Sequence, residues 1–100
     1  MFAEGKRAST SLYRLSAGPG DGRVGIATSK KIGCHARRNR EKRRGREAIR
    51  ALRGELKPHL NYVLVILPAA ESVGEASRVE DLRVLLTKVN RRWDEGLESS

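Results

Sequence analysis

Positively charged side chains recur at helical spacing in the middle of the chain, and they form the pattern with the clearest chemistry. Four of them follow one another at intervals of four residues: Arg38, Lys42, Arg46 and Arg50. A helix would align such residues in one ridge. A guanidinium is planar and carries a fork of N–H donors that fits a phosphate with two parallel bonds. The ridge therefore predicts a surface for nucleic-acid phosphates, with binding that weakens as salt rises.

The distribution of charge favours the same partner. The chain carries a net charge of +9, and the segment from Lys30 to Lys57 holds 12 Lys and Arg against 3 Glu, so the whole excess lies there. A charge run is usually a solvated helix face, but a solubility device would spread its charge over the surface. A concentrated block indicates a polyanion. A membrane surface is the weaker candidate, because the segment lacks the apolar face of an interfacial helix.

Protein-borne catalysis has little support in the sequence. Cys34 and His35 are adjacent but have no second pair of ligands, so a zinc site is not expected. A Cys34 nucleophile would have only His35 and His59 as possible bases, with no pattern that would orient either. Glu41 and Glu47 are six residues apart and fall on different faces of a helix. We therefore expect no catalytic residue and no metal ligand in this chain.

The size and composition of the chain fit a small intracellular protein. With 100 residues, one domain is the default. The longest apolar run, residues 62–67, is far short of the roughly 20 residues that span a membrane. The first residues lack the apolar segment of a signal peptide. A single cysteine, Cys34, cannot form an internal disulfide. These features predict a cytoplasmic protein with no membrane association.

The elements that would position the basic residues follow from periodicity. We expect a strand at 9–16, a turn at 17–22, a strand at 23–29 in a hairpin with the first, a helix at 34–56, a buried central strand at 62–67, a loop at 69–76 and a second helix from Ser77. Pro58 would end the first helix, Ser77 and Glu80 would form a capping box, and Gly96 would be the C-cap of the second. This order predicts an α+β sandwich.

Two motifs in the basic region are specific in residues and spacing. The run RVGIATSKKIG at 23–33, followed by RNR at 38–40, KR at 42–43 and RE at 46–47, resembles the protein subunit of bacterial ribonuclease P. In that family the strand leads directly into the helix that carries the Arg-Asn-Arg motif. Residues 2–7 are similar to the end of the family's first helix. The resemblance thus covers nearly the whole chain, as a single domain with residues 1–5 a remnant of that helix and 97–100 a disordered tail.

The resemblance implies a function and a fold. The protein would assist a catalytic RNA, which requires Mg²⁺, in removing the 5′ leader of precursor tRNA, without an obligate protein partner or a cofactor of its own. It also implies a left-handed β-α-β crossover in a small mixed sheet with helices on one face. The implied RNA contacts are Lys30, Lys31, Arg37, Arg38, Asn39, Arg40, Lys42, Arg43 and Arg46. A cleft between the motif helix and the sheet would receive the leader, lined by Phe2, Tyr13 and Ser29. From the residues alone, Phe2 and Tyr13 could equally be core residues.

Two residues of the motif helix depart from the family, and other interpretations of the chain exist. Glu41 and Gly45 occupy positions that are usually apolar. An acid there loses packing unless it reaches Arg37 or Arg44, and Gly45 lowers helix stability by about 1 kcal/mol. The alternatives are a structural RNA-binding protein of ribosomal-protein type and a truncated, inactive copy. Cleavage of precursor tRNA in the presence of the catalytic RNA would separate them.

Overall fold

Four strands and two long helices make up the computed structural model, which describes residues 6–98. The elements, in chain order, are β1 (Lys6–Ser9), β2 (Tyr13–Pro19), β3 (Val24–Thr28), α1 (His35–Ala51), the short 3₁₀ helix η1 (Arg53–Glu55), β4 (Leu60–Ile66), the 3₁₀ helix η2 (Pro68–Ser72) and α2 (Glu75–Glu98). The predicted strands at 23–29 and 62–67 and both predicted helices are present. The predictions for Phe2 and for residues 1–5 lie outside the described residues.

The strands form one mixed sheet in the order β1-β2-β4-β3. β2 pairs antiparallel with β1 and with β4, while β3 pairs parallel with β4. The predicted hairpin between the strands now seen as β2 and β3 is wrong, because β4 lies between them. Its apolar run is the most continuous in the chain, which suits a strand that is paired on both edges. The prediction of a buried central strand is thereby confirmed.

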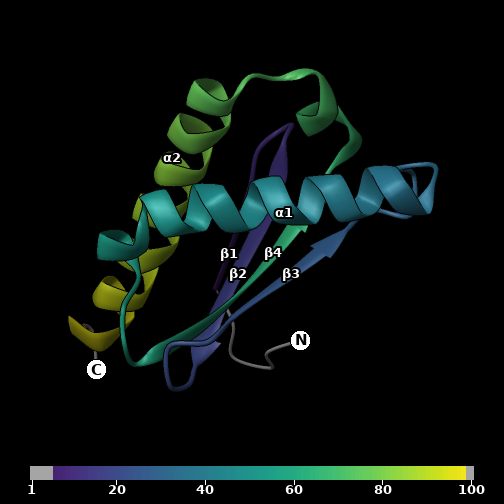
Figure 1. Ribbon diagram of the computed structural model, residues 1–100. Coiled ribbons are helices and arrows are strands. Elements are labelled where there is room, and N and C mark those ends of the chain that lie inside the picture. The colour runs from purple at the N-terminus through teal and green to yellow at the C-terminus, as the bar shows by residue number, and fades with distance from the viewer. Residues whose placement is uncertain (1–5, 99–100) are drawn as a thin grey trace.

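Both helices pack on the same face of the sheet (Figure 1), which confirms the two-layer α+β sandwich. α1 lies over β3 and β4, and α2 lies over β1 and β2. The inward side chains alternate along the strands, as in Tyr13, Leu15 and Ala17 of β2, each at most 1% exposed. The segment β3-α1-β4 is a parallel β-α-β unit; its left-handed crossover stays a prediction. Within the described residues, no helix combines the length and apolarity needed to cross a bilayer.

Several predicted boundaries are wrong. Residues 6–9 form the edge strand β1, where the family resemblance implied the end of a helix. The helix predicted to reach residue 56 ends at Ala51 and gives way to η1. α2 begins at Glu75, so Ser77 lies within its first turn and is not its cap, and the helix continues past Gly96 to Glu98. Residues 97 and 98 are therefore helical, against the predicted tail.

Gly45 has a packing role that helix propensity alone does not reveal. A Cβ at this position would lie 3.0 Å from Ile66 Cδ1 on β4 and 3.5 Å from Ile26 Cγ2 on β3. The missing side chain therefore lets α1 approach the sheet closely at the middle of its buried stripe. Close packing of Ile66, which is 1% exposed, offsets part of the loss in helix propensity.

Candidate nucleic-acid interface

The side of α1 that faces away from the sheet is strongly cationic. Its exposed residues include the predicted RNA contacts Asn39, Arg40 and Arg43, while Arg46 is exposed at the edge of α1 that borders β3. Lys42 is half-buried, and the acidic Glu47 is exposed among them. The buried stripe of Gly45, Ala48 and Ile49 on the opposite side fixes this face toward solvent. The arrangement is therefore a rigid helix that presents guanidinium groups to a polyanion.

Arg37 and Arg38 are committed to contacts within the chain. Arg37 Nε donates to Glu71 Oε2 at 2.8 Å and its Nη2 donates to Oε1 at 2.5 Å, which ties α1 to η2. These hydrogen bonds hold the pKa of the Glu71 carboxyl below its usual value. Arg38 Nε donates to the carbonyl oxygen of Ile32 at 2.9 Å. Both arginines therefore stabilise the position of the N-terminal part of α1, and they also add positive charge.

The turn between β3 and α1 is fixed by its own hydrogen bonds. Ser29 N–H donates to the carbonyl of Ile66 at 2.8 Å, and Lys31 N–H donates to Ser29 Oγ at 3.2 Å. Ile32 is fully buried and anchors the turn in the core. Lys30 and Lys31 are exposed as a result. The turn thus holds two ammonium groups at the corner where the sheet meets the start of α1.

The face of the sheet opposite the helices is hollowed beside this turn. A depression of about 440 Å³ is lined by Ser11, Arg14, Ser29, Lys31, Val65, Leu67, Pro68 and Ala69. Its lining combines apolar surface from Val65, Leu67 and Pro68 with cationic groups from Arg14 and Lys31. Such a groove suits a single strand of nucleic acid, whose phosphates meet cations while its bases lie on apolar surface. Arg14 was not among the predicted contacts.

The predicted contact of Tyr13 with the leader is wrong, whereas the position of the leader cleft between α1 and the sheet stays a prediction. Tyr13 is 1% exposed and points into the core between the sheet and the helices, so its ring cannot stack on a base. The space under the middle of α1 is filled where Gly45 meets Ile26 and Ile66. Beside it, along β3, lies a hollow of about 370 Å³ whose lining includes Arg46 and Arg50. Of the predicted leader residues, Ser29 lies in the depression on the opposite face.

Burial of Tyr13 predicts a stability loss in alkali. Burial raises the pKa of the Tyr13 hydroxyl from 10.0 to about 12. The folded chain therefore keeps this proton more tightly than the unfolded chain, and the resulting stabilisation is complete below pH 10 and is lost between pH 10 and 12. From pH 9 to pH 11 we expect the wild type to lose unfolding free energy relative to Tyr13→Phe, as measured by urea denaturation. A constant difference would contradict the buried hydroxyl.

Glu41 is buried inside a cluster of arginines between the two helices. It is 1% exposed, and its carboxylate receives a hydrogen bond from Arg44 Nη1 at 3.0 Å. Arg40 Nε and Arg78 Nη1 each lie 3.7 Å from a carboxylate oxygen. The predicted compensation by Arg44 is therefore present, whereas Arg37 pairs with Glu71 instead. The contact with Arg78, from α2, was not predicted.

An α+β sandwich with a cationic helix on one side and a grooved, basic sheet face on the other defines a small RNA-binding protein. The family model described as Ribonuclease P matches residues 1–90. The chain therefore belongs to the family of ribonuclease P protein subunits, which act in tRNA 5′ processing. Membership in this family implies association with the ribonuclease P RNA.

Individual relatives agree with this assignment. The chain is 33% identical over 86 residues to the "Ribonuclease P protein component" of an Exiguobacterium species, covering 83% of this chain and 75% of that one. It is 36% identical over 74 residues to the component of Mycobacterium avium, covering 74% of this chain but only 60% of the relative. The structure of the ribonuclease P protein from Thermotoga maritima superposes with a TM-score of 0.72 at 25% identity, covering 88% and 84% of the two chains.

Proposed function

We propose that the chain binds the ribonuclease P RNA through the outward face of α1 and holds the 5′ leader of precursor tRNA on the open face of the sheet. One observation carries the proposal: Ser29 and Lys31, in the turn at 29–33, line the depression, and the same turn leads into α1. A molecule bound to one surface would be held at a fixed angle to a molecule bound to the other. This is the geometry needed to present a scissile bond to a catalytic RNA.

The contribution of the chain is electrostatic and geometric. Two RNAs repel each other through their phosphates, and cations placed between them lower that repulsion while releasing counterions. Bond cleavage and the Mg²⁺ that supports it belong to the RNA, and no side chain of this protein enters the chemistry. The predicted cytoplasmic location follows from this role in tRNA maturation.

Loss of the groove cations should weaken leader binding selectively. We expect Arg14→Ala combined with Lys31→Ala to reduce the affinity of the reconstituted complex for precursor tRNA about tenfold, because two charge-assisted hydrogen bonds are removed. Affinity for mature tRNA, which has no leader, should stay unchanged. Both affinities are measured by filter binding with the chain and a bacterial ribonuclease P RNA at fixed salt.

A charge-matched variant separates specific binding from the effect of net charge. Arg23→Ala with Arg53→Ala also removes two exposed cations, but neither residue belongs to α1 or lines the depression. It should bind precursor tRNA as the wild type does.

Cleavage at low Mg²⁺ tests the whole proposal. In mixtures of the chain, the ribonuclease P RNA and precursor tRNA, the wild type should stimulate leader removal. Binding without stimulation would instead favour a structural RNA-binding protein or an inactive copy.

A further inference from the structure

A second cationic surface lies on α2, away from the residues that the family motifs pick out. It consists of four exposed side chains, called here the α2 basic patch: Arg83, Lys88, Arg91 and Arg92. The sequence outside 30–57 has no net charge, which conceals this patch. Two acids lie at the N-terminal end of the patch: Glu80 is 3.4 Å from Arg83, and Asp81 accepts a hydrogen bond from Thr10 Oγ1 at 2.5 Å. Lys88, Arg91 and Arg92 lie beyond both of these acids along the helix.

Two hollows of the surface meet at this patch. One, of about 240 Å³, is lined by Arg83, Val84, Thr87, Lys88 and Arg91. The other, of about 550 Å³, is lined by Arg7, Ala8, Ser9, Arg14, Leu15, Ser16, Val65, Lys88 and Arg92. Lys88 borders both of them, and Arg14 belongs to the larger hollow as well as to the groove of the open face. The groove and the larger hollow therefore adjoin at Arg14, and the two hollows at the patch adjoin at Lys88.

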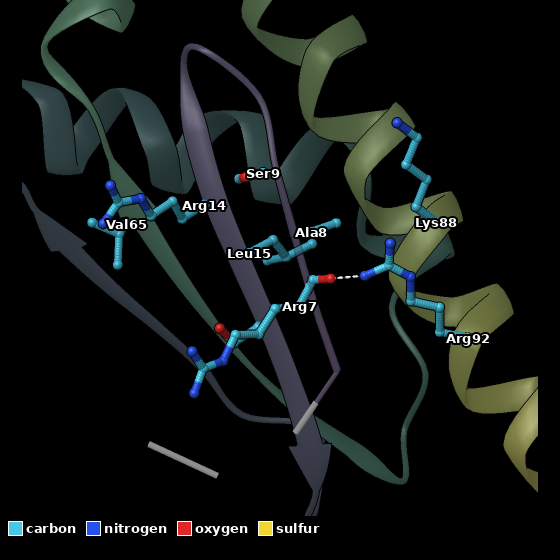
Figure 2. Close-up of a pocket in the computed structure, with 9 residues that line it drawn as sticks. Arg7, Ala8, Ser9, Arg14, Leu15, Val65, Lys88 and Arg92 are labelled. Carbon is cyan, nitrogen blue, oxygen red and sulfur yellow. Dashed lines mark hydrogen bonds between the residues drawn. The ribbon is translucent and has the colours of Figure 1, made fainter. Parts of the chain in front are cut away.

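The larger hollow passes around the edge strand β1. Figure 2 shows Arg7 and Arg14 on one side of this strand and Lys88 and Arg92 on the other. The pairing of Arg7 with Ser16 and of Ser9 with Arg14 places the side chain of Arg7 on the open face. Arg92 donates a hydrogen bond to the carbonyl oxygen of Arg7, which fixes α2 against the strand. Cationic groups thus follow one path from the open face to the outer side of α2.

We propose that the α2 basic patch binds single-stranded RNA that leaves the open face across β1, so that the chain holds leader nucleotides beyond the groove. The inference rests on the proposed leader site. Lys88 and Arg92 are one helical turn apart, about 6 Å along the axis, and can engage successive phosphates. Arginine planes and the 41% exposed Val84 offer surface on which bases stack. A stiff duplex could not bend around a strand edge, whereas a single strand can.

Leader length supplies the decisive test. Precursor tRNAs are prepared with a short leader that covers the groove only and with the same leader extended at its 5′ end. Binding to the reconstituted complex is measured for the wild type and for Lys88→Ala with Arg91→Ala, two residues without a structural role at β1. The extension should strengthen binding by the wild type. The variant should lose that gain, roughly fivefold, and bind the short leader unchanged.

Three results would overturn the inference. The wild type could gain no affinity from the extended leader. The variant with Lys88→Ala and Arg91→Ala could lose affinity equally for both leaders, or it could bind both leaders as the wild type does. The charge-matched pair Arg23→Ala and Arg53→Ala should retain the full gain. If Arg14→Ala with Lys31→Ala affects neither leader, the proposed leader site itself fails, which is a different outcome.

Crosslinking gives a readout that does not depend on affinity. In a Cys34→Ser background, Thr87→Cys on α2 and Ser11→Cys beside the groove each carry a photoreactive group. The label at position 87 should react with the 5′ extension, and the label at position 11 should react with nucleotides nearer the cleavage site. Reaction at position 87 with the ribonuclease P RNA in place of the leader would show that the patch serves the catalytic RNA, and would refute the inference.

Discussion

Replacement of Arg78 by methionine is expected to lower the free energy of unfolding by about 3 kcal/mol. Arg78 is 7% exposed and its Nη1 atom lies 3.7 Å from Glu41 Oε1 between the two helices. Methionine keeps much of the side-chain volume but removes the positive charge. The buried carboxylate would lose one cation but keep Arg44 and Arg40, so the penalty should fall at the lower end of the range for broken buried pairs. Urea denaturation measures the change.

The double variant is the informative control for this result. Glu41→Leu alone leaves Arg78 buried without its acid, and should also destabilise the chain. Glu41→Leu with Arg78→Met removes both charges and should restore at least the wild-type stability, since well-packed apolar pairs often equal or exceed buried ion pairs. Arg83→Met, which breaks the exposed contact with Glu80, should change stability by less than about 1 kcal/mol. If the losses in unfolding free energy of the two single variants add up in the double variant, Glu41 and Arg78 are not energetically coupled.

The pair of Glu41 and Arg78 also illustrates which parts of the fold can be predicted from sequence patterns. Local periodicity predicted α1, β3, the central strand β4 and the course of α2, because each depends on residues close in sequence. Strand pairing, in contrast, depends on residues that are far apart in sequence. β4 enters between β2 and β3 only after the chain has passed through α1, and adjacent apolar runs suggested a hairpin instead. β1 has four residues and lies at an edge, which leaves little pattern to detect.

The candidate site was predictable in part for the same reason. The basic face of α1 follows directly from residue spacing. The strict alternation of Tyr13, Leu15 and Ala17 would have placed Tyr13 in the core and Arg14 on the open face, but the aromatic ring was interpreted as a stacking platform. Helical spacing predicts partners for Glu41 only about one turn away, at Arg37 and Arg44, whereas Arg78 is distant in sequence. The α2 basic patch was hidden by the acidic residues that neutralise that part of the chain overall.

Removal of Arg43 and Arg46 is expected to have the largest effect on RNA binding. Both side chains are exposed on α1, and neither makes a hydrogen bond or ion pair with another described residue. Alanine at both positions should weaken binding to the ribonuclease P RNA roughly a hundredfold at low salt, because each guanidinium would no longer donate charge-assisted hydrogen bonds to phosphate. Substitution of Arg38 would be harder to interpret, because Arg38 also braces the turn through Ile32.

The salt dependence of binding distinguishes phosphate contacts from a change in fold. Each phosphate contact contributes close to one unit to the slope of log affinity against log salt, so the double variant should have a slope shallower by about 2. Thermal unfolding should match the wild type, since neither side chain is buried. The charge-matched pair Arg23→Ala and Arg53→Ala should leave affinity near that of the wild type. An unchanged slope with Arg43 and Arg46 replaced would mean that the catalytic RNA binds a different face, with α1 left in solvent.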